Sequence, residues 1–492
     1  FETLTREDAK IACKVLVWLQ QTTSGDRSEI NIENHDLASW GKIASSASNN
    51  CPYRDGSSCF LRDAREKADG AHLVVVNHAL LLRDSIDGNG VIPEYDYLII
   101  DESHNLEDEA TRQFGFSISR TNLDEYLISI NGQNGILEDI RSYLNRSEDS
   151  NGKVNMPDDI VFEIEDSYAK LKENAEVLWG CISSFLSKND TGSYGRQLMV
   201  RLNRQNMSTK DWTAVETAHG NVDLALSVIE SNLERIYSRL ELQVSGDMSE
   251  SGVLEMKIAN VFKSTRDTRD QLRTFMSKEQ VDKIQWVLQG GNQGNVFMNS
   301  APIKVGDLLN SSMFSKKDSV VLTSATLAIQ GNLDYMSSRL GLDSAEQLIL
   351  GSSFDYPNSV LLTIPTDMPQ INAWDHQEAL VKAIMDICQT MDGSTMVLFT
   401  SHASLRLARN GVKEKLQTLG YQVLGQGVDG TPRQIMAAFQ ANPKSLLLGT
   451  SSFWEGVDFQ HGSLKALIIP RLPFSVPTDP IFAARSELVD NS

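Results

Sequence analysis

The sequence predicts an α/β fold with two parallel-sheet domains, the first of which is interrupted by a helical insert. Short, continuous apolar runs such as residues 97–100 and 319–323 are typical of strands buried on both faces of a parallel sheet. After about residue 340 such runs alternate with amphipathic helical segments, as in a doubly wound sheet. Between residues 121 and 290, apolar residues recur at steps of three and four, which predicts long helices.

Length and composition limit the class of protein. At ~150 residues per domain, 492 residues suggest about three domains. No apolar run is long enough to span a bilayer, so we expect a soluble enzyme or binding protein. The net charge of −20 argues against a general nucleic-acid coat protein, but it allows a narrow DNA groove in an acidic body. Five cysteines predict a reducing compartment, and we expect the cytoplasm.

The first 78 residues contain three expected elements and one loop-rich section. Helical spacing of apolar residues predicts a helix over residues 6–20. A loop-rich section with Cys51 and Cys59 follows, and then a charged helix over residues 60–70. The apolar run within residues 72–78 predicts a further buried strand.

Residues 121–290 differ in character from the segments on either side. Stripes of apolar residues run near 162–186, 222–240 and 253–276, and residues 138–190 are acidic. We therefore predict a helical module inserted between strands of one α/β domain.

Strand character returns at residues 295–298 and 319–323. From there a regular alternation of strands and helices predicts a second doubly wound domain. The strands are expected at 360–364, 395–400, 422–424, 445–449 and 464–469, and the helices at 377–390, 403–418 and 431–440.

Two carboxylates directly follow the strand expected at residues 97–100. Ligands of open parallel sheets bind beyond the carboxyl ends of the strands, where Asp101 and Glu102 lie. One carboxylate there can hold Mg²⁺ on nucleotide phosphates, and a second can orient or deprotonate the attacking water. The alternative is that two acidic residues simply begin a solvated loop.

Several ordered motifs resemble those of superfamily 2 helicases. Residues 101–104, Asp-Glu-Ser-His, resemble the Asp-Glu-x-His box, and residues 321–326 resemble motif III. Residues 448–459 resemble motif V of the DinG and XPD branch, and residues 74–78 and 351–356 also match DinG-type proteins. The resemblance covers nearly the whole chain, although the helical insert matches only in position and character.

The resemblance implies a DinG-type, XPD-like helicase with two RecA-like domains that close on ATP. An iron–sulfur-type loop region and a helical arch-like insert would interrupt the first domain. The implied function is ATP-dependent unwinding by translocation on single-stranded DNA, with 5′ to 3′ polarity, in repair or replication. The implied parts are an iron–sulfur remnant at 1–70, the first RecA-like domain at 71–120 and 291–335, the insert at 121–290, and the second RecA-like domain at 336–492.

The resemblance also implies a role for individual residues. Asp101 would hold Mg²⁺, Glu102 would be the general base, and His104 would couple hydrolysis to movement. A hydrogen-bonded structural histidine is the alternative for His104. Phe453 and Trp454 are expected to pack beneath motif V, with a stacking role as the alternative. Contact with nucleotide, or coupling, is implied for Ser103, Ser324, Ala325, Thr326, Glu455, Gly456 and Asp458, and contact with DNA for Thr450.

Two family motifs do not occur in the sequence. One is the Gly-x-x-x-x-Gly-Lys-Ser/Thr loop that cradles phosphates, and the other is the final motif with its arginine. Because Phe1 and Ser492 both lie close to or within helical patterns, we expect a fragment with both motifs outside it. Arg485 lies near the end but lacks the expected context. We therefore expect this chain alone not to hydrolyse ATP.

The resemblance leaves an iron–sulfur cluster open. Many DinG and XPD relatives hold a [4Fe–4S] cluster with four cysteines in this region, whereas here only Cys51 and Cys59 stand in a suitable loop. Serines occupy the place of the usual closer-spaced trio, at Ser45, Ser46 and Ser48. We interpret the other cysteines as packing thiols, namely Cys13, Cys181 and Cys388.

Two alternative functions stay open at the level of sequence. The chain could be the helicase half of an exonuclease–helicase fusion, or a non-hydrolysing DNA-binding or assembly module that keeps only the fold. A Gly-Lys-Thr loop upstream of Phe1 would favour the enzyme. We expect single-stranded and forked DNA as partners, no membrane, and a monomer.

Overall fold

The structure is a computed structural model. It describes residues 6–30, 32, 36–41, 43–44, 59–88, 90–132, 135–148, 158–189, 198–241, 250–277, 282–290, 295–342, 344–459 and 463–490. Contacts divide the chain into a larger unit, residues 65–349 with 476–492, and a smaller unit, residues 1–64 with 350–475. Among the described residues, no helix combines the length and the apolar character that a membrane span needs.

A parallel strand pair lies in the part of the larger unit outside the helical insert. Strand β1 (Tyr97–Ile100) pairs in parallel with β6 (Ser319–Leu322), so both expected strands form, but neither is buried on both faces as the apolar runs predicted. Leu98 and Ile100 are buried among surrounding helices, whereas Tyr97 and Ile99 on the other face are exposed. The surrounding elements are α4 (His78–Asp87), η3 (Ser103–Asn105), α5 (Leu106–Gln113), α11 (Gly306–Ser312), η5 (Phe314–Lys316) and α12 (Asp334–Leu340).

Two of the expected strands are wrong. Residues 72–77 form no strand, and helix α4 begins at His78, with the Asn77 side chain accepting a hydrogen bond from Leu80 N–H. Residues 360–364 likewise form no strand. Val75 and Leu361 are 86% and 87% exposed. Neither segment pairs with another described strand, and an apolar run without a ladder partner does not make a β-strand.

An antiparallel sheet that the sequence analysis missed joins the helical insert to the rest of the larger unit. The order is β2–β5–β4–β3, and every neighbouring pair is antiparallel. Val287, Val296 and Met298 are buried in the core of the insert. The strand expected at 295–298 therefore packs with the insert. The strands are β2 (Phe116–Ser119), β3 (Leu198–Arg201), β4 (Lys283–Gly290) and β5 (Asn295–Pro302).

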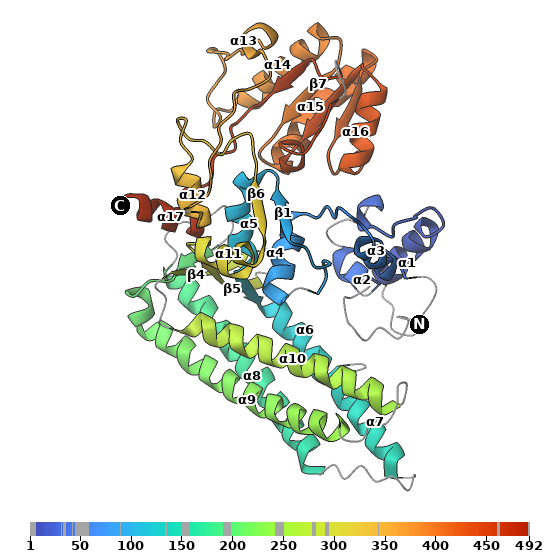
Figure 1. Cartoon of the computed structure of the whole chain (residues 1–492), viewed down its shortest axis with the longest axis vertical. Coiled ribbons are helices and arrows are strands. Elements are labelled where there is room, and N and C mark those ends of the chain that lie inside the picture. Colours follow the sequence, from blue (N-terminus) through green and yellow to red (C-terminus); the bar gives the residue numbers. More distant parts are fainter. Residues whose placement is uncertain are drawn as a thin grey trace. The chain divides into compact units, whose positions relative to one another are not determined.

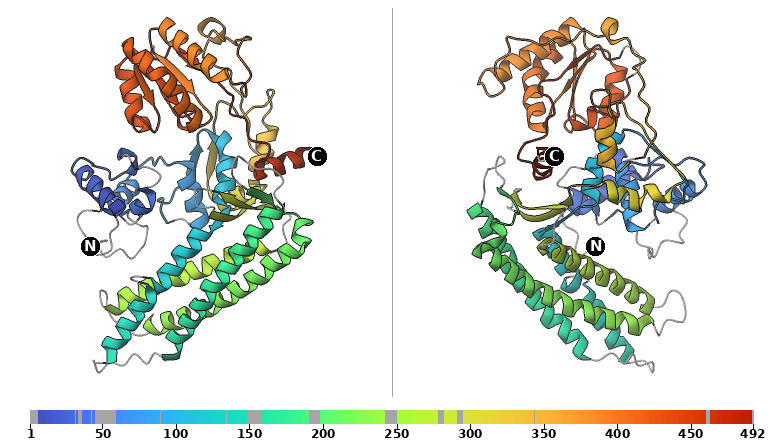
Figure 2. Two further views of the ribbon diagram at one scale, coloured as in Figure 1. Left: turned by 180° about the vertical axis from the view of Figure 1, so that it is seen from behind. Right: turned by 60° about the vertical axis from the view of Figure 1, so that its left-hand side comes forward.

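The helical insert is confirmed, and three long helices lie side by side in it (Figures 1 and 2). At about 1.5 Å per residue, the 32 residues of α8 or α9 extend ~48 Å. The apolar stripe of α9, from Val222 to Leu240, faces the core, as its spacing predicted. The helices are α6 (Arg120–Asn131), α7 (Ile136–Glu148), α8 (Asp158–Asn189), α9 (Lys210–Glu241) and α10 (Glu250–Met276), with η4 (Asn206–Ser208) before α9.

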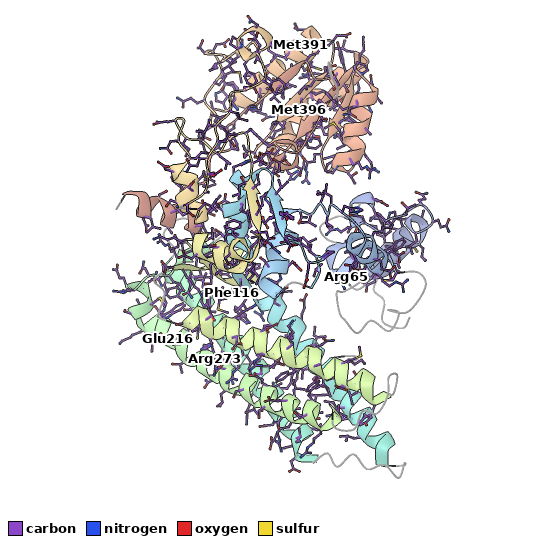
Figure 3. All side chains as sticks on the ribbon, viewed as in Figure 1. Arg65, Phe116, Glu216, Arg273, Met391 and Met396 are labelled. Atoms are coloured by element: carbon purple, nitrogen blue, oxygen red, sulfur yellow. The ribbon has the colours of Figure 1, made fainter. Side chains whose placement is uncertain are left out.

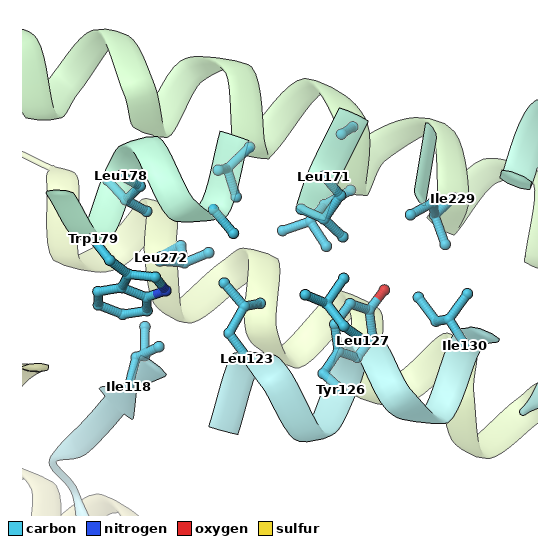
Figure 4. Packing of buried hydrophobic residues seen from close by; sticks show 14 of the residues in the cluster. Ile118, Leu123, Tyr126, Leu127, Ile130, Leu171, Leu178, Trp179, Ile229 and Leu272 are labelled. Atoms are coloured by element: carbon cyan, nitrogen blue, oxygen red, sulfur yellow. The ribbon is translucent and has the colours of Figure 1, made fainter. Parts of the chain in front are cut away.

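The core of the insert is continuous from the antiparallel sheet into the helices. Figure 4 shows Trp179 beside Ile118 of strand β2, and the α6 residues Leu123 and Leu127 on the face that meets the other helices. The Tyr126 hydroxyl donates to Thr265 Oγ1 at 2.9 Å, and burial raises the pKa of Tyr126. The buried tyrosine is thus satisfied and stays protonated.

Charged side chains tie α9 to α10 outside that core. Asp223 accepts hydrogen bonds from Arg269 at 3.0 Å and from Arg273 at 2.7 Å. Burial alone raises the pKa of Asp223, but the two arginines bring it below its ordinary value. Figure 3 marks Arg273 on α10. These bonds fix the register of two long helices along their polar sides.

The smaller unit contains the predicted doubly wound sheet. Its order is β10–β7–β9–β8, with all strands parallel. Alternate residues of the strands face α14 and α15 on one side and α16 on the other. The elements are α14 (His376–Thr390), β7 (Thr395–Leu398), α15 (His402–Thr418), β8 (Gln422–Gly425), α16 (Pro432–Ala441), β9 (Ser445–Gly449), η6 (Ser451–Phe453) and β10 (Ala466–Ile468).

The remaining helices lie within the first 69 residues, just before α14, and at the C-terminal end of the described chain. They are α1 (Arg6–Trp18), η1 (Arg27–Glu29), α2 (Leu37–Gly41), α3 (Phe60–Asp69), α13 (Tyr356–Ser359) and α17 (Pro480–Asp490). Although residues 336–492 were expected to form one domain, α17 packs on β4 within the larger unit. The expected domain boundaries stay a prediction.

One ion pair fixes the loop that follows β8. Arg409, which is 8% exposed, donates through Nε to Asp429 Oδ2 at 2.8 Å and also contacts Oδ1. The same Oδ2 accepts from Gly425 N–H at 2.7 Å. Burial raises the pKa of Asp429, but these hydrogen bonds from Arg409 and Gly425 outweigh it and lower the pKa below its usual value.

We predict that Arg409→Met lowers the free energy of unfolding of the smaller unit by about 2 kcal/mol, because Asp429 loses charged hydrogen bonds. Since the pKa of Asp429 is depressed in the folded state, its contribution is fully present above the ordinary carboxyl pKa of ~4 and disappears as the pH falls through the folded value. Amide hydrogen exchange in β8 and β9 of the whole chain, measured between neutral and acid pH, tests both statements.

The matched control is Lys444→Ala, which removes the exposed pair that Lys444 Nζ makes with Asp392 at 3.3 Å. It should change exchange in β8 and β9 little, because solvent screens exposed pairs. Two results would contradict the prediction. One is equal amide exchange in the wild type and in Arg409→Met. The other is that Asp429→Asn loses protection on acidification to the same extent as the wild type.

Candidate functional site

The turn after β1 is bound to the end of β6 by backbone hydrogen bonds. Thr323 N–H donates to Ile100 O at 2.9 Å. Ser103 returns two bonds to Thr323 O, from its backbone N–H at 3.1 Å and from its Oγ at 3.2 Å. Ser103 is fully buried, so it serves the turn rather than a solvent-facing contact. The ends of the two strands are therefore held in one register.

His104 joins the two sequence motifs that β1 and β6 carry. Its Nδ1 lies 2.8 Å from Ser324 Oγ and 3.3 Å from Glu102 Oε2. Ser324 Oγ in turn accepts from Thr326 N–H at 3.2 Å. Four of the expected site residues thus lie together, although they come from segments about 220 residues apart. Ala325 is exposed between Ser324 and Thr326.

The two acidic residues lie exposed at the carboxyl end of β1. Glu102 has φ 49° and ψ 41°, the left-handed region that residues with a Cβ rarely adopt. Its N–H donates to Asp101 Oδ1 at 2.9 Å. Such a strained backbone is kept where its surroundings fix it, and it occurs preferentially at functional sites.

Sequence reasoning missed one histidine that contacts this turn. His78 Nε2, at the start of α4, lies 2.8 Å from the backbone oxygen of Asp101. Nε2 therefore donates, because a carbonyl oxygen only accepts. The signal was present in the sequence, since His78 ends the 74–78 segment that matches DinG-type proteins. That segment was interpreted only as a strand.

Asp101 and Glu102 fit the chemistry of a magnesium site. Mg²⁺ prefers carboxylate oxygens together with water and substrate phosphates, and both carboxylates are exposed at one strand end. In the described ranges, no three or more histidine, cysteine, aspartate and glutamate side chains gather as a larger metal site. The carboxylate pair therefore suits an ion that is shared with a substrate.

Of the two expected iron–sulfur ligands, the structure describes only one. Cys59 is half-buried just before α3, whereas Cys51 lies outside the described residues. Cys13, expected to pack, is exposed on α1, so that interpretation is wrong. Cys388 is buried, and burial raises the pKa of its thiol to about 11, as expected of a core residue.

In the smaller unit, Thr450 follows β9 and is buried in a polar network. Gln426 Oε1 accepts from Thr450 N–H at 2.7 Å and from Thr450 Oγ1 at 2.9 Å. His402 Nε2 lies 3.4 Å from the same hydroxyl. Gln426, His402 and Thr450 thus cluster at the carboxyl ends of β8, β7 and β9. The sequence singled out only Thr450.

The remaining expected residues of motif V lie just beyond this network. Phe453 is 3% exposed and packs in the core, and Trp454 Nε1 donates to Phe399 O at 3.4 Å, as the packing interpretation predicted. Glu455, Gly456 and Asp458 are exposed, and Gly456 takes φ 71°. Packing of the aromatics beneath thus leaves the polar residues accessible.

Two family models match this chain. The DEAD_2 model matches residues 2–123, and the model of the helicase C-terminal domain matches residues 384–492. The first match contains the Asp-Glu-Ser-His turn, and the second contains motif V.

Curated relatives match over most of the chain. It is 28% identical to the 3'-5' exonuclease DinG of Bacillus subtilis over 96% of this chain and 51% of that protein. It is 29% identical to the ATP-dependent DNA helicase YoaA of Escherichia coli, over 96% of this chain and 66% of that protein. The chain thus spans about half to two thirds of the length of these relatives.

Among solved structures, the chain is similar to S. tokodaii Xpd4, with 16% identity, a TM-score of 0.39, and coverage of 83% of this chain and 67% of that chain. The DEAD_2 match precedes the helicase C-terminal match along this chain, and the two relatives match over nearly all of it. The chain is therefore similar to the DinG and YoaA proteins, and a match to the DEAD_2 model is followed along it by a match to the helicase C-terminal domain.

Proposed function

We propose that the protein is an ATP-dependent DNA helicase that acts in DNA repair or replication. The observation that carries the proposal is the contact of His104 with both Ser324 and Glu102, because it ties the two expected ATPase motifs into one site. The names of relatives such as the ATP-dependent DNA helicase YoaA support the same activity. ATP would be the substrate.

Each residue of the turn has a chemical task in this proposal. Asp101 would hold Mg²⁺, which supplies charge neutralisation on the phosphates. Glu102 takes the proton of the attacking water, since its carboxylate is exposed beside the expected metal ligand. His78, by donating to Asp101 O, orients the turn that carries both carboxylates.

His104 couples this site to the end of β6. Its Nδ1 lies within reach of Glu102 and Ser324, so a change in the charge on Glu102 changes which partner the ring prefers. Thr326 N–H is bonded to the same serine hydroxyl, so movement of Ser324 passes to the backbone beyond β6.

DNA is the proposed partner, held as a single strand or fork. Thr450, which was expected to contact its backbone, is only 3% exposed, so it would act through the polar network that it forms with Gln426 and His402 at the carboxyl ends of three neighbouring strands. Single strands are bound mainly through phosphates by hydrogen-bond donors and cations. The insert would separate strands, while the acidic residues of 138–190 would repel duplex.

Three finer properties stay predictions. They are a [4Fe–4S] cluster that includes Cys51 and Cys59, a cytoplasmic location, and a monomeric state. The expectation that residues 1–492 alone do not hydrolyse ATP also stays a prediction. The activity tests below concern the natural full-length protein.

Glu102→Gln should abolish ATP hydrolysis and preserve ATP binding. Loss of the base removes a contribution of ~10²–10⁴-fold to the rate, while Asp101 still offers its carboxylate. Steady-state ATPase and equilibrium nucleotide binding measure the two effects separately. Glu94→Gln, which changes an exposed glutamate before β1, is the control and should behave as wild type. Wild-type turnover in Glu102→Gln would remove Glu102 from this role.

His104→Ala and Ser324→Ala should lose the stimulation of ATPase by DNA, and their double mutant should be no worse than either single mutant. The two side chains share one hydrogen bond, so their effects are expected to be non-additive. The measurement is kcat with and without single-stranded DNA for all four proteins of the cycle. Additive losses would show that the contact does not carry coupling.

Replacement of residues 121–281 by a short linker should abolish strand separation and retain DNA-stimulated ATPase. This deletion keeps β2, β4 and β5, so the remaining strands still pair. A fork-unwinding assay and an ATPase assay on the same preparation give the comparison. An unchanged unwinding rate would refute the role of the insert, and circular dichroism identifies a variant that merely unfolds.

A further inference from the structure

Two arginines from distant parts of the chain converge on one buried carboxylate behind the Asp-Glu turn. Glu107, in the first turn of α5, is 8% exposed. Its Oε1 lies 2.5 Å from Arg339 Nη2 and 3.1 Å from Arg485 Nη2. Arg339 belongs to α12, which follows motif III, and Arg485 belongs to α17. We name these three side chains the Glu107 clasp.

Arg485 holds α5 at more than one point. Its Nη1 lies 2.6 Å from Asp108 Oδ1, and its Nη2 donates to Thr111 Oγ1 at 2.5 Å. Thr111 passes the contact on, because its hydroxyl donates to Glu107 O at 2.8 Å. One guanidinium therefore binds the carboxylates of two successive residues and the hydroxyl one turn later.

Helix α5 directly follows the Asp-Glu turn, so contacts with α5 affect that turn. Leu106 begins α5 directly after the 3-10 turn Ser103–Asn105, so Glu107 lies three residues beyond His104. A helix is stiff, and its first turn cannot rotate without moving the turn that precedes it. The Glu107 clasp thus sets the orientation of the segment that carries Asp101, Glu102 and His104.

Helix α17 is itself anchored independently of the clasp. Ile481 and Ala484 pack with Ile284 of β4 and Ala301 of β5. Glu487 accepts from Arg201 of β3 through both carboxylate oxygens, at 2.6 and 2.9 Å. Because these anchors lie on the antiparallel sheet, Arg485 connects that sheet to α5.

We propose that Arg485 is a positioning residue for the proposed ATPase turn, and that it acts through Glu107 and Asp108 of α5. The inference rests on the proposed function for its kinetic readout. Both terminal nitrogens of Arg485 are engaged by α5, and its side chain is only 13% exposed. In this arrangement it serves α5, so the arginine expected to reach the γ-phosphate is a different residue.

The experiment compares Arg485→Ala with Arg201→Ala in the full-length protein. Arg201→Ala removes the ion pair between α17 and β3, whereas Arg485→Ala removes the two ion pairs between α17 and α5. We expect Arg485→Ala to lower kcat of ATP hydrolysis by about tenfold or more with little change in KM for ATP, and Arg201→Ala to leave both near wild type. Asp108→Asn, which leaves Glu107 paired, should give a smaller loss.

Hydrogen exchange without nucleotide supplies a readout that does not depend on activity. Amides of residues 102–108 should exchange about tenfold faster in Arg485→Ala and at the wild-type rate in Arg201→Ala. If Arg485→Ala does not fold, Arg485→Lys should show the same pattern more weakly, because lysine lacks the planar fork.

Equal exchange at residues 102–108 in the two variants would overturn the inference, because α17 would then act only as a packing element. An unchanged kcat in a folded Arg485→Ala protein would overturn it as well. Absence of ATPase in the wild type would instead refute the proposed function, and the exchange data would still decide whether Arg485 positions the turn.

Discussion

The hydrogen-bonded join between the ends of β1 and β6 is the constraint on which the candidate site depends. Ile100 O, Thr323 N–H and Ser103 fix two strand ends that are far apart in sequence. Once that register is set, the side chains that follow each strand must meet, and His104 reaches Ser324 without further adjustment. The left-handed backbone at Glu102 is the local cost of turning the chain within this space.

Three surrounding parts of the larger unit stabilise this join. His78 binds the turn from α4, the Glu107 clasp binds it through α5, and the buried face of β1 binds it through the core. In the proposed site, these contacts position the turn and do not themselves touch the substrate. Their shared effect is pre-organisation, which is the main contribution that a protein makes to phosphoryl transfer.

Sequence patterns predicted the elements whose signal is local. The strands at 97–100 and 445–449 are continuous apolar runs, and the helices of the insert have continuous stripes. The strand expected at 72–78 failed because a strand needs a partner, and pairing is not encoded in the run itself. Within the site, the sequence predicted the residues of recognised motifs. It missed His78, Gln426 and Glu107, whose roles arise only from contacts with distant elements.

The division of the chain into units has a consequence for how this protein can be taken apart. The backbone passes from one unit to the other at residues 64–65, 349–350 and 475–476. No single cut therefore releases either unit intact, since each is built from two separate stretches of polypeptide. A fragment that ends near residue 475 would retain the smaller unit and still strip the larger one of α17. Truncation at a boundary chosen by linear order would thus remove part of the larger unit, although it was meant to affect only the C-terminal end of the chain.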